Sequence, residues 1–199
     1  MNFTFLEVCD KELLERVFAF RYKILLETYP EYLEVSGYSD AKEHDKYDNY
    51  SVHFAALDDD GEVCATVRLI HHSPIGYPTE NSMAFDNSMF KRDKLGEMSR
   101  IFVDTKYRNI QTTKKIIQAV KTFMYIKMMK LGIEYTYGSL EESFLRLLRI
   151  YKMNYNTLGK KQKYEHADVG MRYPSILYTE RLGADNPEII DIYRSNYDA

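Results

Sequence analysis

Charged residues on segments that otherwise read as buried sheet limit what this chain can fold into. Residues 97 to 103 read Glu-Met-Ser-Arg-Ile-Phe-Val, and Arg68 stands inside the apolar stretch 62–71. An unpaired buried charge destabilises a fold strongly, so each such residue needs a partner of opposite charge. Three acids on an earlier segment can supply partners, namely Glu43, Asp45 and Asp48. We therefore expect one shared polar site inside an apolar fold.

Length and composition suit one globular domain that spans residues 1–199. Hydrophobic residues make up 45% of the 199 positions and charged residues 29%, which is enough for a sizeable core. The net charge of −3 argues against nucleic-acid binding over the whole surface. The sequence contains no run of about 18 apolar residues, so it predicts no membrane span. The first residues do not read as a signal peptide. Cys9 and Cys64 form no metal or disulfide pattern, so we expect reduced packing residues and a cytoplasmic protein.

Hydrophobic periodicity predicts alternating strands and helices. The hairpin signal is Asp58-Asp59-Asp60-Gly61 between two apolar segments. On the first helix, Arg21 falls in the middle of the apolar stripe, so it needs a carboxylate partner. Long loops are expected over 29–50 and 73–96. The expected strands are 2–8, 51–57, 62–71, 97–103, 134–138, 155–158 and 175–179, and the expected helices are 11–28, 112–131, 141–152 and one that starts at Pro187. This order predicts an α/β (α+β) fold, with a central mixed sheet flanked by helices.

The element order and the charges together resemble the GNAT acyltransferase superfamily. More narrowly, they resemble the branch that holds acyl-homoserine-lactone synthases, N-acyl amino acid synthases and exosortase-associated acyltransferases. The matching residues are Arg21 on the first helix, Glu43-x-Asp45-x-x-Asp48, Arg68 followed by Leu69, Glu97-x-x-Arg100, and Val103 with Tyr107 and Arg108. The C-terminal part is similar to the N-acyl amino acid branch, in Leu147-Leu148-Arg149, Leu158-Gly159 and Gly170-x-Arg172-x-Pro174.

Two departures from the branch affect the expected substrates. Autoinducer synthases usually have a tryptophan and an aromatic residue where this chain has Glu31 and Leu25. The GNAT phosphate loop usually contains glycines, but residues 108–113 contain none, which hinders backbone approach to a coenzyme A pyrophosphate. The resemblance therefore implies transfer of a medium or long acyl chain to an amino acid. The missing glycines favour an acyl carrier protein as the donor, with acyl-CoA as the other possible donor. An autoinducer synthase that uses S-adenosylmethionine, a CoA-dependent acetyltransferase and an inactive carrier-protein- or lipid-binding domain remain the alternatives.

The implied reaction is attack of an amine on a thioester, for which a carboxylate takes the amine's proton directly or through water. Glu97 is the candidate base, although it could equally form only a salt bridge. Glu97 and Arg100 would lie on opposite faces of a regular strand, so we expect a β-bulge near Met98–Ser99 to bring both into the catalytic site. In GNAT folds this strand is also splayed to admit the donor's pantetheine arm. The resemblance places that arm against Ile101, Phe102, Val103 and Arg108.

The resemblance also implies that the remaining charges shape the acceptor site as a polar network, which Arg100 joins as a structural partner. These residues are Arg21, Glu43, Asp45, Asp48 and Arg68, and Asp45 could bind the acceptor's ammonium. The simpler reading is a solvated acidic loop and an arginine at a hairpin end. Tyr151 is a weaker candidate for a general acid.

Basic residues in the second half of the chain could form a surface that steers an acidic carrier protein. They are Lys114, Lys115, Arg146, Arg149 and Lys152, with Lys121 on the same helix as the first two; solvated helix faces are the alternative. A second set could line an acyl tunnel or simply pack the core, namely Phe123, Met124, Met128, Met129, Phe144 and Leu148. We expect no metal site, because His71 and His72 would point apart on a strand, and His166 is expected to be structural. No tightly bound cofactor is expected.

Overall fold

The structure is a computed structural model that describes residues 2–30, 33, 38–164 and 170–197. The strands are β1 (Thr4–Glu7), β2 (Ser51–Leu57), β3 (Val63–His71), β4 (Leu95–Val103), β5 (Tyr135–Leu140), β6 (Asn156–Thr157), β7 (Gln162–Lys163) and β8 (Met171–Tyr178). The helices are α1 (Lys11–Thr28), α3 (Pro78–Ser82), α4 (Ile110–Lys130), α5 (Glu142–Ile150), α6 (Thr179–Asp185) and α7 (Pro187–Tyr197). Three 3₁₀ turns are η1 (Asp48–Tyr50), η2 (Arg92–Lys94) and η3 (Thr105–Tyr107). His166 and part of the expected loop 29–50 lie outside the described residues.

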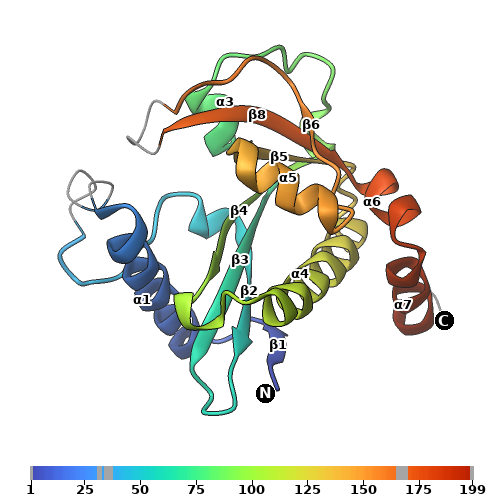
Figure 1. The fold of residues 1–199 in the computed structure, drawn as a ribbon. Helices are drawn as coiled ribbons and strands as arrows, with labels where there is room; N and C mark the ends of the chain where they lie inside the picture. The colour runs from blue at the N-terminus through green and yellow to red at the C-terminus, as the bar shows by residue number, and fades with distance from the viewer. Residues whose placement is uncertain (1, 31–32, 34–37, 165–169, 198–199) are drawn as a thin grey trace.

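The strands form one mixed sheet in the order β1-β2-β3-β4-β5-β8-β6, and β7 also pairs with β8. Every pair is antiparallel except β4 with β5, which is parallel. Helices flank this sheet, so the predicted α/β class is confirmed (Figure 1). None of the described helices is long and apolar enough to cross a membrane.

Local signals account for the elements that match the prediction. Helix α1 begins after Asp10, whose side chain accepts a hydrogen bond from the amide of Leu13, as an N-cap does. The β2–β3 hairpin turns at Gly61, which has a φ of 79°. Strand β8 begins at residue 171, earlier than expected, while the strand expected at 155–158 shrinks to two residues. Helix α6 was not predicted.

The expected loop 73–96 is not structureless, because it contains α3 and η2. Pro78 starts α3, and the Glu80 side chain caps it by accepting from the amide of Tyr77 at 2.9 Å. Proline is favoured in the first helical turn, and this short helix ends after five residues. The density of Pro and Gly in this segment therefore marks a short capped helix as well as turns.

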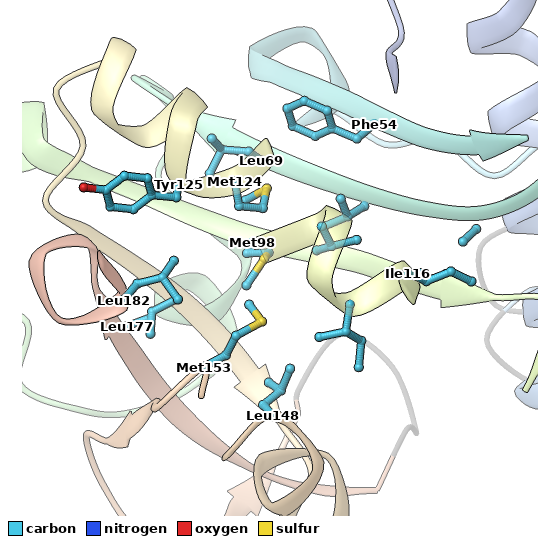
Figure 2. Close-up of a cluster of buried hydrophobic side chains, with 14 of the residues drawn as sticks. Phe54, Leu69, Met98, Ile116, Met124, Tyr125, Leu148, Met153, Leu177 and Leu182 are labelled. Atoms are coloured by element: carbon cyan, nitrogen blue, oxygen red, sulfur yellow. The ribbon is translucent and has the colours of Figure 1, made fainter. Parts of the chain in front are cut away.

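The two faces of the sheet carry different apolar cores. On one face, α4 packs over β2 and β3 in a cluster that includes Leu69, Met98 and Met124 (Figure 2). On the other face, α1 packs against β3 and β4. Because successive strand residues point to opposite faces, Arg68 lies on the α1 face while Leu69 lies on the α4 face. Cys64 is buried in the α4-side core, but Cys9 is exposed, so the expectation that Cys9 packs inside is wrong.

Strands β4 and β5 separate partway along their length. Their ladder covers only Leu95 with Tyr135, Gly96 with Thr136, and Glu97 with Tyr137. Past Glu97, β4 continues with β3 as its one paired neighbour among the described strands. Figure 1 shows the result as two arms, with β2–β4 running in one direction and β5 with β8 in another. The sheet is therefore open on the β5 side of residues 98–103, and Glu97 lies where the opening begins.

Candidate active site

Arg21 has the carboxylate partners that its place on the apolar stripe requires. Its side chain is 0% exposed. Its Nε atom donates to Oε2 of Glu43, and its NH1 atom donates to Oδ1 of Asp48 at 2.9 Å. The ring of Phe18 lies 5.2 Å from the guanidinium carbon. This pairing ties α1 to the segment that precedes β2.

Two further arginines, from β3 and β4, join the same acids. Arg68 NH1 donates to Asp45 Oδ1 at 2.7 Å and to Asp48 Oδ1 at 2.8 Å. Arg100 donates to Glu43 Oε1, from Nε at 3.0 Å and from NH2 at 2.7 Å, and to Asp45 Oδ2 at 3.1 Å. Three arginines and three acids thus form one network in which the charges balance. We call these six residues, Arg21, Arg68, Arg100, Glu43, Asp45 and Asp48, the ion-pair network.

Two acids of the network, Glu43 and Asp48, have lowered pKa values. Burial alone would raise the pKa of Glu43, but Arg100 and Arg21 outweigh burial and lower that pKa to about 2. Burial likewise opposes ionisation of Asp48, yet Arg68 and Arg21 hold its pKa well below the usual range. The side chain of Asp48 also accepts from the amide of Asp45 at 2.7 Å, which orders the turn. Glu43 and Asp48 are therefore poor proton acceptors at neutral pH, and their contacts are structural.

Strand β4 carries a bulge in which Arg100 and Ile101 together oppose Val67 of β3. Arg100 has a φ of 54°, in the left-handed region that residues with side chains seldom adopt. The extra residue puts the Arg100 side chain on the same face as Ser99, toward the ion-pair network. The strand therefore has the expected bulge, but the predicted position at Met98–Ser99 is wrong by two residues.

Glu97 makes a different set of contacts from the other acids. It is 2% exposed, and its two oxygens accept from the amide and from the hydroxyl of Thr79, both at 2.9 Å. Burial raises the pKa of Glu97 to about 7, against the opposing effects of these hydrogen bonds and of Arg68. A carboxyl with that pKa exchanges a proton near neutral pH, which suits general acid–base chemistry. Its hydrogen bonds go to Thr79 rather than to an arginine.

Sequence reasoning missed three residues around these charges. Thr79 lies on α3, inside a segment that was expected to be a loop. Ser99 accepts from Arg68 Nε at 3.0 Å through its hydroxyl. His53 is buried on β2 with Nε2 3.7 Å from Asp48 Oδ1, and burial lowers its pKa to about 4. The sequence offered one signal for these three residues: Ser99 is two residues after Glu97 on the same strand, so both side chains are expected on one face.

The residues expected to hold the donor lie along the open edge of β4. Ile101, Phe102 and Val103 are half-buried, in contrast to the fully buried first residues of the strand. Arg108 Nε donates to the carbonyl oxygen of Val103 at 2.9 Å, so Arg108 fixes the end of the strand. Asn109 caps α4, and its side chain accepts from the amide of Thr112 at 3.0 Å.

The expected basic surface loses one member. Lys114, Lys115, Arg146, Arg149 and Lys152 are exposed, on α4 and at α5. Lys121 is buried instead, and its Nζ contacts Oδ1 of Asn186 and, at 3.4 Å, the carbonyl oxygen of Tyr151. This face of α4 packs against the ends of α5 and α6, so Lys121 is buried and is not part of the basic surface. Tyr151 follows α5 and is half-buried.

The apolar residues proposed for an acyl tunnel separate into two groups. Met124, Met128 and Leu148 are in the buried cluster of Figure 2, and Phe144 packs against it. Phe123 stacks on Phe54 at 5.2 Å between ring centroids. Met129 is 40% exposed, so it does not line a buried tunnel.

The two adjacent histidines do not point apart as expected. His72 has a φ of 46°, and its Nδ1 lies 3.1 Å from Nδ1 of His71. The left-handed residue just past the strand end turns the second ring toward the first. Among the described residues, no group of three or more His, Cys, Asp or Glu side chains is arranged to hold a metal ion.

Comparisons with known proteins agree with this geometry. The family model of the acetyltransferase (GNAT) domain matches residues 20–118. The CoA-dependent acyl-homoserine lactone synthase BjaI, in a structure with MTA, is 19% identical with a TM-score of 0.71 over 94% of this chain and 90% of that one. TofI, in a ternary complex with an inhibitor and MTA, is 15% identical with a TM-score of 0.69 over 95% and 100% of the two chains. FeeM, an N-acyl amino acid synthase from uncultured soil microbes, is 12% identical with a TM-score of 0.64 over 92% and 94%. A search of curated proteins finds no match.

The family match covers the second half of α1, the ion-pair network, Glu97 and the start of α4, while the solved structures share the fold over nearly the whole chain. Residues 20–118 therefore match a GNAT acetyltransferase domain, and this match supports an N-acyltransferase.

Proposed function

We propose that the protein, as a single domain, transfers an acyl chain of medium or long length from a carrier-protein thioester to the amine of an amino acid, which gives an N-acyl amino acid. The observation that carries this proposal is Glu97, a buried carboxyl with a pKa of about 7 at the point where β4 and β5 separate. The reaction needs no oxidant, reductant or tightly bound cofactor, because the thioester is already activated. The two cysteines are free, which is compatible with a cytoplasmic location.

In this mechanism the neutral amine attacks the thioester carbonyl carbon. A free α-amino group has a pKa of about 7.7–8, so a base that titrates nearby can take its proton. Glu97 receives that proton, through a water molecule because its carboxyl is buried. The new C–N bond forms, the C–S bond breaks, and the proton held by Glu97 passes to the sulfur, which leaves as a thiol and returns Glu97 to the carboxylate. We assign stabilisation of the oxyanion to a peptide N–H group of β4 past the opening.

The acceptor is proposed to contact the accessible end of the ion-pair network. Asp45 is 21% exposed and Arg100 is 18% exposed, whereas Arg21, Arg68 and Glu43 are fully buried. A partly exposed carboxylate beside a partly exposed guanidinium matches the ammonium and carboxylate groups of an amino acid. The buried members would hold these two side chains in place.

A carrier-protein donor is favoured by the start of α4. The side chain of Asn109 already accepts from the amide of Thr112, which would otherwise be available to an anion such as a pyrophosphate. The pantetheine arm of a carrier protein has no adenosine diphosphate and needs no such site. The opposing observation is the fold shared with BjaI, which is described as CoA-dependent. The exposed residues Lys114, Lys115, Arg146, Arg149 and Lys152 are the proposed docking surface for the acidic carrier protein.

Charge reversal on α5 tests the donor. The double variant Arg146→Glu/Arg149→Glu is expected to raise KM for an acyl carrier protein about tenfold and to leave kcat unchanged, because exposed charges act mainly on encounter. The same variant should use acyl-pantetheine as well as wild type does. Its raised KM for the acyl carrier protein should approach the wild-type KM in high salt. Lys11→Glu/Lys91→Glu, which reverses two other exposed lysines, is the matched control. An equal loss with acyl-pantetheine would contradict carrier docking on this surface.

A second candidate function is acyl-homoserine lactone synthesis with S-adenosylmethionine, because the acyl-homoserine lactone synthases BjaI and LasI share the fold and BjaI has been solved with SAM. Mass spectrometry of organic extracts from bacteria that overproduce the protein separates the two. We expect an N-acyl amino acid with the wild type that is absent with Glu97→Gln. An acyl-homoserine lactone in its place would establish the second candidate. Neither product from a folded, expressed protein would overturn both.

A further inference from the structure

Glu97 is held by one residue that lies outside the expected site motifs. We propose that Thr79 is a positioning residue, which fixes the orientation of the Glu97 carboxyl and keeps it ionised for proton transfer. The inference rests on the proposed function, in which Glu97 is the base. It assigns a role to α3, which the rest of the mechanism leaves unused.

The contact between the two residues is bidentate and buried. The Thr79 amide donates to Glu97 Oε2 and the Thr79 hydroxyl donates to Oε1, both at 2.9 Å. Thr79 is 0% exposed and Glu97 is 2% exposed. A carboxylate offers about four lone-pair sites, so this arrangement leaves two for a water molecule or an amine. Two bonds to two oxygens also fix the carboxyl plane, which one bond would not do.

The rest of α3 is clamped, so Thr79 is held firmly against Glu97. Glu80 accepts from the Tyr77 amide at 2.9 Å with one oxygen, and its other oxygen accepts from Arg92 NH1. Asn81 Nδ2 donates to the Tyr47 hydroxyl at 2.9 Å. These contacts reach α3 from η2 and from the segment before β2. They fix the first turn of α3. The amides of a first helical turn have no partner inside the helix, so the Thr79 amide is available to bond Glu97.

The charged and titratable groups that act on Glu97 come from each element packed around it. Arg68 of β3 favours the carboxylate, and Glu80 of α3 disfavours it. The hydroxyls of Tyr77, Tyr137 and Tyr155 feel the Glu97 charge as well. Burial is the largest effect and favours the protonated acid, whereas both Thr79 hydrogen bonds favour the carboxylate. Loss of the Thr79 hydroxyl therefore shifts the balance toward an acid that cannot accept a proton.

Carbon-13 NMR of protein labelled at the glutamate carboxyls measures this without substrate. The resonance missing from Glu97→Gln identifies Glu97, and its titration is followed in wild type, Thr79→Val and Thr79→Ser. Thr79→Val keeps the shape and the amide but removes the hydroxyl, so we expect the Glu97 pKa to rise by about one unit, or tenfold in the acid constant. Thr79→Ser keeps the hydroxyl and should titrate as wild type does.

Kinetics give the second readout. The acidic limb of the kcat/KM profile should move upward with Thr79→Val by the same amount as the pKa, with activity recovered at high pH. An unmoved Glu97 titration, or an equal activity loss at every pH, would show that Thr79 is merely structural. If Thr79→Val does not fold, Thr79→Ala removes the same hydroxyl without adding a methyl group, and the same outcomes apply. Full turnover in Glu97→Gln would overturn the proposed function instead, whatever the Thr79 titrations show.

Discussion

Replacement of Glu97 by glutamine is expected to lower kcat/KM at least about 100-fold, because a positioned general base contributes about 10² to 10⁴. Glutamine has nearly the same shape but cannot take a proton from the amine. It can still accept from the Thr79 amide, while its NH₂ donates to the Thr79 hydroxyl, so the contacts of Glu97 are preserved. The loss should therefore appear in kcat rather than in KM. Steady-state kinetics with an acyl thioester and the acceptor identified by mass spectrometry measure it.

The same substitution is expected to stabilise the protein above neutral pH. The pKa of Glu97 is about 7 in the native state, against an ordinary value of 4.5. Between these two values the native state binds more protons than the unfolded state, so its stability falls as pH rises. Glutamine carries no such penalty. We expect Glu97→Gln to unfold at higher denaturant than wild type at pH 8, by roughly 1–3 kcal/mol, and the difference to vanish below about pH 4.5.

These two results together separate a base from a structural acid. Replacing a residue that is needed only for folding would lower both the activity and the stability of the protein. The Glu97→Gln variant should instead have lower activity and higher stability than wild type. Wild-type turnover by the variant would remove Glu97 from the mechanism. A stability gain that grows as the pH falls would contradict the raised pKa.

Local signals were enough to predict which charges need partners. The place of Arg21 on the apolar stripe of α1 required a carboxylate, and the turn sequence ending at Gly61 predicted the hairpin with nearly the observed bounds. A charge on a buried segment needs a partner of opposite charge, even when that partner is distant in the sequence. The sequence could therefore indicate that a network exists, but not its geometry.

The remaining features depend on contacts between distant segments. The bulge lies at Arg100 because the side chain reaches Glu43, 57 residues away, and no local pattern fixes that register. Helix α3 has only five residues, too few to be stable alone, so contacts such as that between Glu80 and Arg92 hold it. Thr79 was therefore missed. Lys121 was assigned to the surface because the helices that cover it, α6 and α7, follow more than 50 residues later.

Replacement of Glu43 by glutamine is expected to destabilise the protein by about 2–4 kcal/mol at neutral pH, since it leaves the buried network with one positive charge in excess. Glu43 bonds both Arg21 and Arg100. Without it, Arg21 keeps Asp48 and Arg100 keeps Asp45, but three arginines then share two acids. Denaturant unfolding of wild type and variant measures the loss. Glu142→Gln, which removes an exposed partner of Arg146, should cost less than about 1 kcal/mol and serves as the control.

The effect of Glu43→Gln should depend on pH in the direction set by the lowered pKa. Glu43 has a native pKa of about 2 against an ordinary 4.5, so its stabilisation is fully present above about pH 4.5 and disappears as pH falls toward 2. The difference between wild type and variant should narrow over that range. Arg100 should also lose its charged contact with Glu43 and keep only that with Asp45, so the left-handed backbone at the bulge relaxes and turnover falls even where the variant is folded. A variant that keeps wild-type stability at pH 7 would show that the buried network is not what holds α1 to β4.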